Sequence, residues 1–399
     1  MPTLTCQLTG SGRGGVASIA ILGPQALVLL KTFFQPASPT AKFTPNRILY
    51  GTWNGRSERA GESIVVTPLC EDHFQIHCHG GKAAVEQILT DLQASGAQRC
   101  EWSEWLTAQG VPLLQAEAEQ ILSQTSTRKT AAIAYDQVRG ALHQQALSWR
   151  AELLLATSPA EGAVPVSQPT DPAILSSIQS EAASILEARE IGIHLTQPWK
   201  VVLAGPPNVG KSSLLNGLLG YRRAITFDSP GTTRDVLSAD VVFAGWPIEL
   251  SDTAGQRVAI DAIEGEGIAR AQQEMAEADL ILLVTDASRD SSEPSTFSYE
   301  GSTPVLSVLN KVDLRPEEPA STNPDPTFFE TVATTGDGLP RLIEAIVKTL
   351  VPVPPTSGTA LPILPRQIDC LQRIRSASTV ESALQAVNDL MGFANAPAA

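Results

Sequence analysis

The sequence predicts a multidomain protein of the α/β and α classes, with an N-terminal α/β domain and a helical domain that holds an inserted domain with a mostly parallel sheet. Three observations support this prediction: short apolar segments and turns before residue 100, helical spacing without proline from residue 113 to 155, and alternating strands and helices after residue 199. The chain has 399 residues, of which 43% are hydrophobic, so it is long enough for two or three domains with hydrophobic cores.

The first 100 residues show the pattern of a small α/β domain. An apolar segment at 16–22 ends at a Gly-Pro pair, a helical pattern covers 24–34, and a further strand is indicated at 74–78. His79-Gly80-Gly81 then precedes a helix expected at 82–92. We interpret this tripeptide as a strand-to-helix turn, which either is purely structural or directs free amides toward an anionic ligand.

The histidines of this domain and the cysteines of the chain are potential metal ligands. His77 and His79 would share one face of their strand, with His73 further along it, yet the structural turn is the favoured interpretation and a metal site is not predicted. The five cysteines are scattered and contain no Cys-x-x-Cys pair. Neither a disulfide framework nor a thiolate zinc site is therefore expected, and the cysteines are interpreted as small core residues or free thiols.

The middle and the end of the chain are expected to be helical. Apolar residues recur near helical spacing between residues 113 and 155, and a further helix is predicted at 174–186. Between them, residues 158–172 are rich in Pro, Ser and Gly, as is typical of a linker. After the proline-rich segment 351–365, one or two final helices are predicted to end at Met391.

These patterns divide the chain into three predicted domains. Residues 1–100 form the α/β domain, residues 101–197 and 353–399 the helical domain, and residues 198–352 the inserted domain. Short apolar strands separated by helices favour a mostly parallel sheet in the inserted domain, and they lie at 201–204, 241–243, 280–284 and 305–309.

Charge and hydropathy exclude several classes of protein. The formal net charge is −14, but residues 1–100 hold eight basic against six acidic side chains, whereas residues 286–337 hold three against ten. DNA is therefore not expected as a partner, and tRNA would contact a local patch on the first domain. No apolar run approaches the roughly 20 residues of a membrane span, and no secretory signal follows Met1, so no membrane association and a cytoplasmic location are expected.

The segment Gly205-Pro-Pro-Asn-Val-Gly-Lys-Ser212 has the spacing of a phosphate-binding loop (P-loop) and lies between a predicted strand and a predicted helix at 213–219. Its glycines let the backbone wrap closely around phosphates, Lys211 places a positive charge on the β and γ oxygens, and the Ser212 hydroxyl is offered to Mg²⁺. The nucleotide contacts predicted from this loop are Asn208, Val209, Gly210, Lys211, Ser212 and Ser213.

Two later segments have the chemistry of nucleotide switches. Within Gly231-Thr-Thr-Arg-Asp235, Thr232 and Thr233 are predicted nucleotide contacts, and Thr233 is placed to reach Mg²⁺ and the γ-phosphate. In Asp252-Thr-Ala-Gly255, the Asp252 carboxylate would hold the Mg²⁺ shell and the Gly255 amide would sense the γ-phosphate. The predicted Mg²⁺ ligands are thus Ser212, Thr233 and Asp252.

The segment Asn310-Lys-Val-Asp313 predicts which base is bound. A carboxylate at Asp313 accepts the two hydrogens on the N1 and N2 edge of guanine, whereas adenine lacks that edge. Asn310 and Lys311 would brace the base plane and the loop. Ala333 lies in a weak match to the last guanine loop, where backbone amides would support the base. The chain is therefore predicted to bind GTP and GDP and to hydrolyse GTP as a P-loop GTPase.

Further segments outside this core carry a family resemblance. Gly12-Arg-Gly-Gly-Val-Ala17, Ile76-His-Cys-His-Gly-Gly81, Leu114-Gln-Ala-Glu-Ala118 and the pattern from Asp261 to Arg270, taken with Asn208, resemble the MnmE/TrmE tRNA-modification GTPases over residues 5–391. The resemblance implies a GTPase domain inserted in a helical domain and a homodimer formed through a folate-binding-like N-terminal domain. It also implies an MnmG-type flavoprotein as partner and the wobble uridine of tRNA as substrate.

The resemblance further implies how hydrolysis would occur. Asn208 matches an asparagine that binds K⁺ when two GTPase domains meet, and backbone carbonyls from Phe227 to Ser229 would complete the K⁺ shell. Glu264 aligns with a glutamate that positions the attacking water. Gln256 directly follows Asp-Thr-Ala-Gly and is the second candidate for that catalytic role.

Two departures from the family pattern leave an alternative function open. The terminal Cys-x-Gly-Lys sequence is not found in the last residues, which read Met391-Gly-Phe-Ala-Asn-Ala-Pro-Ala-Ala399. The segments Ala20–Pro24 and Pro68–His73 also differ from the family pattern, which weakens the expectation of a folate one-carbon donor. The alternative is a divergent regulatory GTPase that binds a protein partner and performs no tRNA chemistry.

Overall fold

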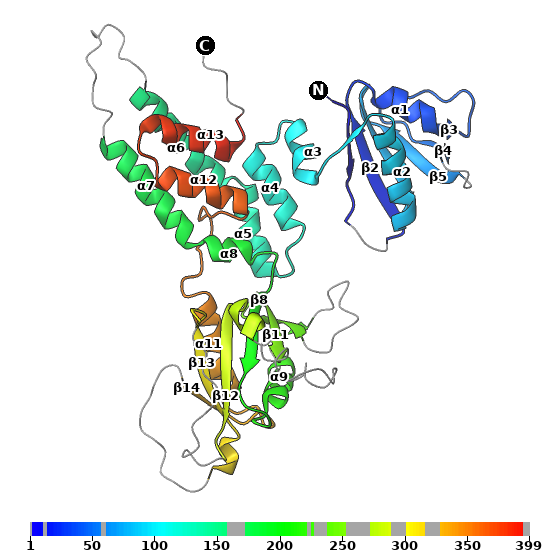
Figure 1. Ribbon diagram of the computed structural model, residues 1–399. Coiled ribbons are helices and arrows are strands. Elements are labelled where there is room, and N and C mark those ends of the chain that lie inside the picture. The colour runs from blue at the N-terminus through cyan, green and yellow to red at the C-terminus, as the bar shows by residue number, and fades with distance from the viewer. Residues whose placement is uncertain are drawn as a thin grey trace, which may run out of the picture. The chain divides into compact units, whose positions relative to one another are not determined.

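The computed structural model forms two compact units, Met1–Gln120 and Ile121–Ala399, which are described separately here (Figure 1). It describes residues 2–10, 14–56, 61–157, 172–221, 225–226, 238–252, 272–288, 301–315 and 328–393. Within these residues no helix combines the length and the apolar character that a membrane crossing requires.

The first unit is built on a seven-stranded sheet with the order β3-β4-β5-β6-β2-β1-β7. Neighbouring strands in this sheet pair antiparallel, except for β1 and β7, which pair parallel. The strands are β1 (Leu4–Gln7), β2 (Val16–Leu22), β3 (Phe34–Pro36), β4 (Leu49–Trp53), β5 (Glu62–Pro68), β6 (His73–His79) and β7 (Gln98–Arg99). The strands predicted at 16–22 and 74–78 are confirmed.

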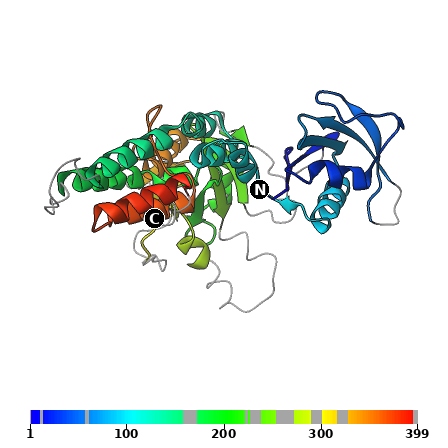
Figure 2. The ribbon, with the colours of Figure 1, turned by 90° about the horizontal axis from the view of Figure 1, so that it is seen from above.

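Helices α1 (Ala26–Phe33) and α2 (Lys82–Ala94) cover the apolar face of this sheet, as Figure 2 also shows. Leu30 of α1 and Ile88 of α2 are fully buried in one core with Ile19 and Ile76. On the opposite face of the sheet, Ala20 is buried in a smaller cluster. The unit extends to Gln120 and so also contains α3 (Trp102–Ala108) and most of α4 (Leu113–Leu122). The domain boundaries drawn from the sequence stay predictions.

In the second unit, helices from the beginning and from the end of residues 121–399 pack into one bundle. Helix α13 lies against α6 and α12 lies against α7, although about 200 residues separate them in sequence. Arg150 of α6 donates to Asn388 of α13 at 2.9 Å, and Gln179 of α7 donates to the Ala377 carbonyl at 2.7 Å. The helices are α5 (Arg128–Val138), α6 (Ala141–Thr157), α7 (Pro172–Glu187), α8 (Arg189–Ile193), α12 (Pro365–Arg375) and α13 (Val380–Met391).

The inserted domain lies between α8 and α12 in the chain and contains a second seven-stranded sheet with the order β14-β13-β12-β8-β11-β10-β9. The first five strands of that order run parallel, and β10 and β9 complete the sheet antiparallel. The strands are β8 (Trp199–Ala204), β9 (Ile225–Thr226), β10 (Ser238–Phe243), β11 (Trp246–Asp252), β12 (Leu280–Asp286), β13 (Val305–Asn310) and β14 (Phe328–Thr331). The mostly parallel sheet is confirmed, while the strands predicted from the sequence do not include β9, β11 and β14.

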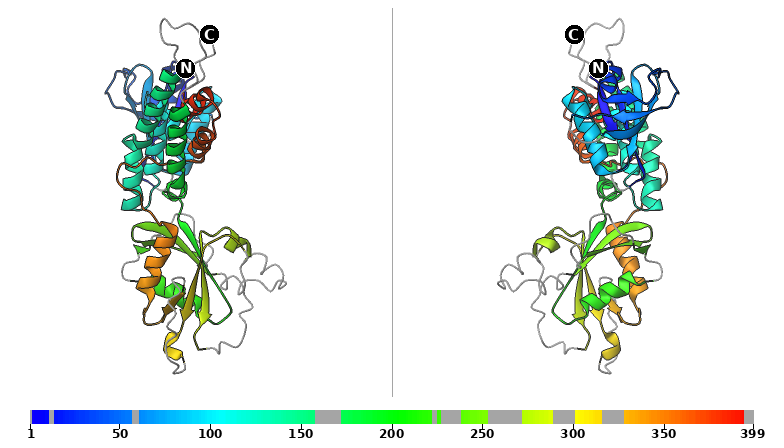
Figure 3. Two further views of the ribbon diagram at one scale, coloured as in Figure 1. Left: turned by 90° about the vertical axis from the view of Figure 1, so that its left-hand side faces the viewer. Right: turned by 90° about the vertical axis from the view of Figure 1, so that its right-hand side faces the viewer.

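Both faces of the second sheet are covered (Figure 3). Helices α9 (Lys211–Leu219) and α11 (Leu339–Leu350) bury their apolar sides against one face, where Leu218 and Ile346 are fully buried. Met275, within the helical residues 272–276, packs on the opposite face. Coverage on both sides explains why the central strands read as continuous apolar runs.

Candidate nucleotide-binding site

Five parallel strands end at the same edge of the inserted domain and deliver the polar residues of the candidate site. The carboxyl ends of β8, β11, β12, β13 and β14 lie side by side because these strands are neighbours and run in one direction. Ligands of open α/β sheets bind in the crevice beyond this edge. The segments that follow the strands include the P-loop after Ala204 and the predicted guanine loop at Asn310.

The backbone of the P-loop explains the residue types in it. Gly205 has φ +135°, and a Cβ there would lie 2.2 Å from the Val284 carbonyl oxygen. Gly210 has φ +94°, and a Cβ there would lie 2.3 Å from the Asn310 amide nitrogen. Asn208 adopts the left-handed conformation at φ +67°, which asparagine tolerates better than most residues. The loop can therefore approach its neighbours only because glycine occupies these two positions.

Lys211 is buried at the start of α9, and its ammonium group lies inside the loop. Its Nζ donates to the carbonyl oxygens of Gly205 at 2.9 Å and Pro206 at 2.8 Å. A buried ammonium needs such acceptors because an unpaired charge is costly away from water. Phosphate oxygens would be stronger acceptors for the same group, since they carry charge.

The structure brings together two of the predicted Mg²⁺ ligands. The Ser212 hydroxyl at the start of α9 donates to Asp252 Oδ2 at 2.7 Å, and Asp252 is only 3% exposed at the end of β11. A hydroxyl oxygen beside a carboxylate oxygen is the type of donor set that suits a hard cation such as Mg²⁺. Among the described residues, no cluster of three or more His, Cys, Asp or Glu side chains could hold a metal, so an ion here would depend on other oxygen ligands.

Asn310 links three segments of the site and is only 1% exposed. Its Nδ2 donates to the Val209 carbonyl at 3.1 Å, while its Oδ1 accepts from the Ala333 amide at 3.2 Å and the Thr331 hydroxyl at 3.3 Å. The side chain thus uses both ends of its amide to hold the P-loop to the end of β14. The Ala333 N–H donates to Asn310 and so fixes the loop. The predicted contact of Ala333 with a base stays a prediction.

Lys311 joins the same two loops through its side chain. Its backbone is left-handed at φ +60°, and its Nζ donates to the Asn208 carbonyl at 2.7 Å and to Asp286 Oδ2 at 2.7 Å. The predicted base-recognition loop and the predicted phosphate loop are therefore connected before any ligand is considered. Asp313 follows in the 3₁₀ helix η2 (Val312–Leu314), where it is exposed and accessible to a base edge.

Asp286 is a site residue that the sequence reasoning missed. It ends β12, and its carboxylate accepts from Lys311 and from the Ser288 hydroxyl at 2.6 Å. Burial raises the pKa of Asp286, but the hydrogen bonds from Lys311 and Ser288 outweigh burial and lower the pKa below its ordinary value of 3.8. The signal was available, because an aspartate directly follows an apolar strand at the edge where the other motifs lie.

Of the remaining predicted residues, Val209 is buried in the core, and Ser213 is exposed on α9. The Asn208 side chain is exposed and makes no hydrogen bond with another described residue. Several predicted residues lie outside the described part of the chain: Phe227, Ser229, Thr232, Thr233, Gly255, Gln256 and Glu264. Their predicted roles stay predictions.

Two of the three histidines of the first unit have side-chain hydrogen-bond partners, whereas the buried Nε2 of His73 has none among the described residues and its ring packs edge-on against Trp105. His77 Nδ1 lies 2.8 Å from the Ser18 hydroxyl on the adjacent strand, and His79 pairs with Glu62. Burial lowers the pKa of His77. The turn after His79 is confirmed, and Gly80 is required there because a Cβ would lie 2.1 Å from the Gly14 carbonyl oxygen. The five cysteines are free thiols, with Cys70 exposed and the others buried.

Comparisons with known proteins agree with this geometry. Residues 200–311 match the family model described as 50S ribosome-binding GTPase. The chain is 32% identical to the tRNA modification GTPase MnmE of Synechococcus sp. (strain JA-3-3Ab), over 94% of this chain and 86% of that protein. It is 36% identical to the protein of that name from Prochlorococcus marinus (strain MIT 9303), over 85% of this chain and 78% of that protein. It is 32% identical to the protein of that name from Chloroflexus aurantiacus, over 99% of this chain and 94% of that protein.

A comparison with solved structures returned the G domain of the T. maritima FeoB iron transporter. That chain is 28% identical, with a TM-score of 0.29, and the match covers 38% of this chain and 99% of that chain.

Proposed function

The chain belongs to the MnmE family of tRNA modification GTPases, and from this premise we propose that it hydrolyses GTP with Mg²⁺ and K⁺ to support modification of the wobble uridine in tRNA. The observation that carries the proposal is the connection of the P-loop and the guanine loop by Asn310 and Lys311 at the carboxyl edge of the parallel sheet. We call these two connected loops the frame. Because the frame forms without a ligand, it fixes the distance between the predicted base site and the predicted phosphate site, so that both can bind one nucleotide at once.

Each part of the frame is assigned one task toward the nucleotide. Lys211 exchanges its carbonyl acceptors for phosphate oxygens, because a charged acceptor binds an ammonium more strongly than a neutral one. Asp313 accepts from the N1 and N2 hydrogens of guanine. Val209, Gly210 and Ser213 complete the loop around the phosphates, and Thr232, Thr233 and Gly255 are proposed to contact the γ-phosphate side.

Mg²⁺ fits the pair formed by Ser212 and Asp252, with Thr233 as a third proposed ligand. When bound, the ion would neutralise charge that develops on the β- and γ-phosphates. The chain's own contribution is the short hydrogen bond between Ser212 and Asp252, which holds both oxygens at one place before an ion arrives.

K⁺ is proposed to bind at Asn208, together with the carbonyls of Phe227 and Ser229. The support is that the Asn208 side chain is exposed at the P-loop, while its carbonyl is held by Lys311. GTP turnover should then be faster in K⁺ than in Na⁺ at equal ionic strength. Equal rates in the two salts would exclude this proposal.

Glu264 is proposed to position the attacking water, with Gln256 as the second candidate. The test is single-turnover hydrolysis by Glu264→Ala and Gln256→Ala with the nucleotide already bound. We expect Glu264→Ala to lose at least about 100-fold in rate, the scale of losing a positioned catalytic group. If Gln256→Ala loses that activity while Glu264→Ala keeps it, the two roles are exchanged.

Base specificity gives the most direct test of the nucleotide site. Asp313→Asn replaces an oxygen acceptor by an amide donor facing guanine, so the affinity for GDP should fall by about 10- to 100-fold. Fluorescent GDP titration measures this, and Asp369→Asn, at an exposed aspartate on α12, serves as the control. An unchanged affinity in Asp313→Asn would contradict recognition of guanine by this residue.

The tRNA role is tested in the cell. Deletion of the gene should remove the wobble-uridine modification from tRNA, measured by mass spectrometry of nucleosides, and the intact gene should restore it. An unchanged nucleoside profile would favour a regulatory GTPase without tRNA chemistry. A homodimer and an MnmG-type flavoprotein are the proposed partners, and co-purification with that flavoprotein checks the second of them. A folate one-carbon donor is not included in the proposal.

A further inference from the structure

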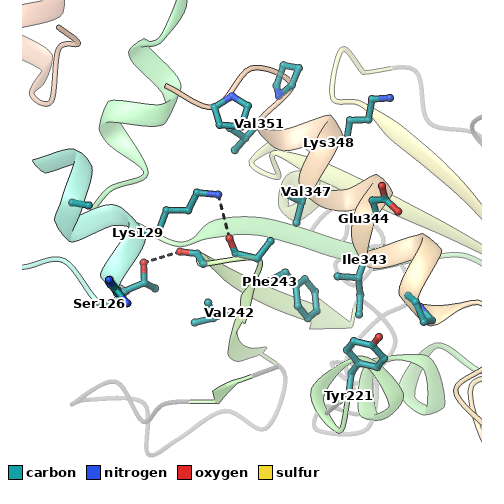
Figure 4. Close-up of a pocket in the computed structure, with 18 of the residues that line it drawn as sticks. Ser126, Lys129, Tyr221, Val242, Phe243, Ile343, Glu344, Val347, Lys348 and Val351 are labelled. Carbon is teal, nitrogen blue, oxygen red and sulfur yellow. Dashed lines mark hydrogen bonds between the residues drawn. The ribbon is translucent and has the colours of Figure 1, made fainter. Parts of the chain in front are cut away.

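The second unit has a groove between α5 of the helical part and α11 of the inserted domain (Figure 4). The groove forms a cavity of about 1340 Å³. It is located where β11 begins, whereas the candidate nucleotide site is located where β11 ends at Asp252. The groove is therefore separate from the nucleotide site. Most of its lining is apolar and includes Val242, Phe243, Ile343, Val347 and Val351.

The α5 wall of the groove is attached to the inserted domain by specific contacts. The Thr127 hydroxyl donates to the Gly245 carbonyl at 2.7 Å, and Lys129 Nζ donates to the Ala244 carbonyl at 3.2 Å (Figure 4). Lys129 also lies 4.8 Å from the centre of the Trp246 ring. Gly245 has φ +89°, and a Cβ there would lie 2.9 Å from the Lys129 side chain, so the close approach depends on glycine.

The charge of the groove is opposite to that of the chain. Four cations line it, against the single acidic side chain of Glu344, although the whole chain has a net charge of −14. The cations are Arg128, Lys129, Arg341 and Lys348. Within the described part of the chain, none of the four forms an ion pair. Lys129 is held by the Ala244 carbonyl and the Trp246 ring, whereas Arg128, Arg341 and Lys348 leave positive charge beside the apolar floor for a ligand that is both acidic and apolar.

The spacing on α11 defines the shape of that ligand. Ile343 and Val347 are half-buried and lie four residues apart, and Val351 continues the row directly after the helix. Arg341 and Lys348 are exposed and lie seven residues apart, which places them about two turns, or roughly 10 Å, from each other on the same helix. By helical geometry these two cations lie together on one side of the apolar row, next to Glu344, and Arg128 and Lys129 line the groove from α5 on the other side. An apolar row with cations along both sides complements a helix with an apolar stripe and acidic flanks.

We propose that this groove docks an acidic amphipathic helix of a partner protein. The apolar floor favours a peptide over a nucleic acid, because a phosphodiester backbone would leave the exposed apolar surface of the half-buried Ile343 and Val347 uncovered. Apolar side chains of the helix lie along Ile343 and Val347, and its carboxylates pair with Arg341 and Lys348.

The test uses the full chain and a synthetic probe. The probe is a fluorescent helical peptide of about four turns, with leucines at helical spacing and glutamates on both flanks. Fluorescence anisotropy should give a dissociation constant on the order of 10 µM. The double variant Arg341→Glu, Lys348→Glu should weaken binding at least about tenfold, as should Val347→Asp, since each removes one half of the complementarity.

Two controls separate the groove from general effects. Arg375→Glu reverses an exposed charge on α12, and it should bind the peptide like the unmodified chain. Basal GTP hydrolysis should be unchanged in the Arg341→Glu, Lys348→Glu variant, because both residues lie outside the candidate nucleotide site. This second readout distinguishes failure of the groove proposal from failure of the proposed GTPase function.

Several results would overturn the proposal. The first is that the peptide does not bind, or binds the double variant as tightly as the unmodified chain. A second is that a peptide with lysines in place of the glutamates binds equally well, which would show apolar adhesion only. A third is displacement of the peptide by a short single-stranded RNA that itself binds with a Kd in the same range. A change of oligomeric state in the double variant, measured by sedimentation, would instead identify a second copy of this chain as the occupant.

Discussion

Each unit of this chain contains one sheet of seven described strands, and the two sheets place their polar groups differently. The sheet of the inserted domain is mostly parallel, so the ends of β8, β11, β12 and β13 meet at one edge together with Lys211, Asp252, Asp286 and Asn310. The sheet of the first unit is mostly antiparallel, so consecutive strands end at opposite edges. Its polar histidines lie on a face, as His77 and Ser18 do.

This difference explains why the polar groups of the candidate nucleotide site collect at one edge of the parallel sheet. A parallel sheet collects several loops at one edge, and each loop contributes one polar group to the same point. In the antiparallel sheet of the first unit, α1 and α2 cover one face, and the other face combines a smaller apolar cluster under α3 with polar contacts between neighbouring strands, such as that of His77 with Ser18. Five predictions test this division of roles, and their effects are taken from the largest to the smallest.

The largest effect is expected at the edge of the parallel sheet. Lys211→Ala removes the buried ammonium of the P-loop, so kcat/KM for GTP should fall by about 1000-fold or more, equivalent to roughly 4 kcal/mol. Steady-state phosphate release measures this. Lys200→Ala is the matched control, because Lys200 is an exposed lysine at the start of β8, away from the site. A variant with the activity of the control would remove Lys211 from the phosphate site.

The second effect concerns packing in the first unit. Gly80→Ala would place a Cβ 2.1 Å from the Gly14 carbonyl, and we expect a loss of about 2 to 3 kcal/mol in the free energy of unfolding. Gly81→Ala is a close control, because a Cβ at Gly81 has no atom within 4 Å. Urea denaturation of both variants measures the difference. Equal stability of the two would show that the turn adjusts without cost.

The same two variants test the independence of the two sheets. GTP hydrolysis by Gly80→Ala should equal that of the unmodified chain when the folded protein is assayed. A reduced rate with the fold intact would show that the first unit influences the nucleotide site, and the division of roles between the two sheets would then fail.

A smaller effect is expected from the residue that the sequence reasoning missed. Asp286→Asn removes the charge that holds Lys311, and GDP affinity should fall by about tenfold, or roughly 1.4 kcal/mol. A double-mutant cycle with Lys311→Met provides the control: the second substitution should add little, because both remove one interaction. Additive losses would show that Asp286 acts without Lys311.

The smallest effect concerns pH and the first unit. Burial lowers the pKa of His77 from its ordinary value of 6.5, so the unfolded chain takes up a proton at a higher pH than the folded chain does. Above pH 6.5 His77 is neutral in both states and does not change the free energy of unfolding. As the pH falls from 6.5 through the lower pKa of the folded state, the unfolded chain binds the proton more readily, so the free energy of unfolding decreases. Urea midpoints between pH 7.5 and 5 should fall less steeply in His77→Gln. Parallel pH curves would contradict this, and His79→Gln, at an exposed histidine, serves as the comparison.

Local sequence was sufficient for much of the fold and of the nucleotide site. The strand at 16–22, the helix α9 and the mostly parallel sheet follow from apolar periodicity and from turn residues, which act over a few neighbours. The P-loop was equally readable, because its glycines are required by the φ angles of Gly205 and Gly210.

Other features depend on contacts between distant segments. The strand β11 has a proline and polar residues, and it becomes a strand because it pairs with β8 and β10. The partnership of Asp286 with Lys311 joins two strands through their order in the sheet, and the use of the Ala333 amide by Asn310 joins β13 to the segment after β14. No local pattern encodes such pairings, because strand order is decided by the packing of the whole domain.

The sequence by itself determined the nucleotide motifs, their order and the family, because each depends on residue type at fixed spacing. Only the tertiary structure decided how those motifs are connected and where the basic groove lies. The groove combines Lys129 of α5 with Phe243 of β10 and Lys348 of α11, and the first and the last of these lie more than 200 residues apart in the chain. The net charge of −14 does not indicate this basic groove, because its positive field arises from cations that only the folded chain brings together.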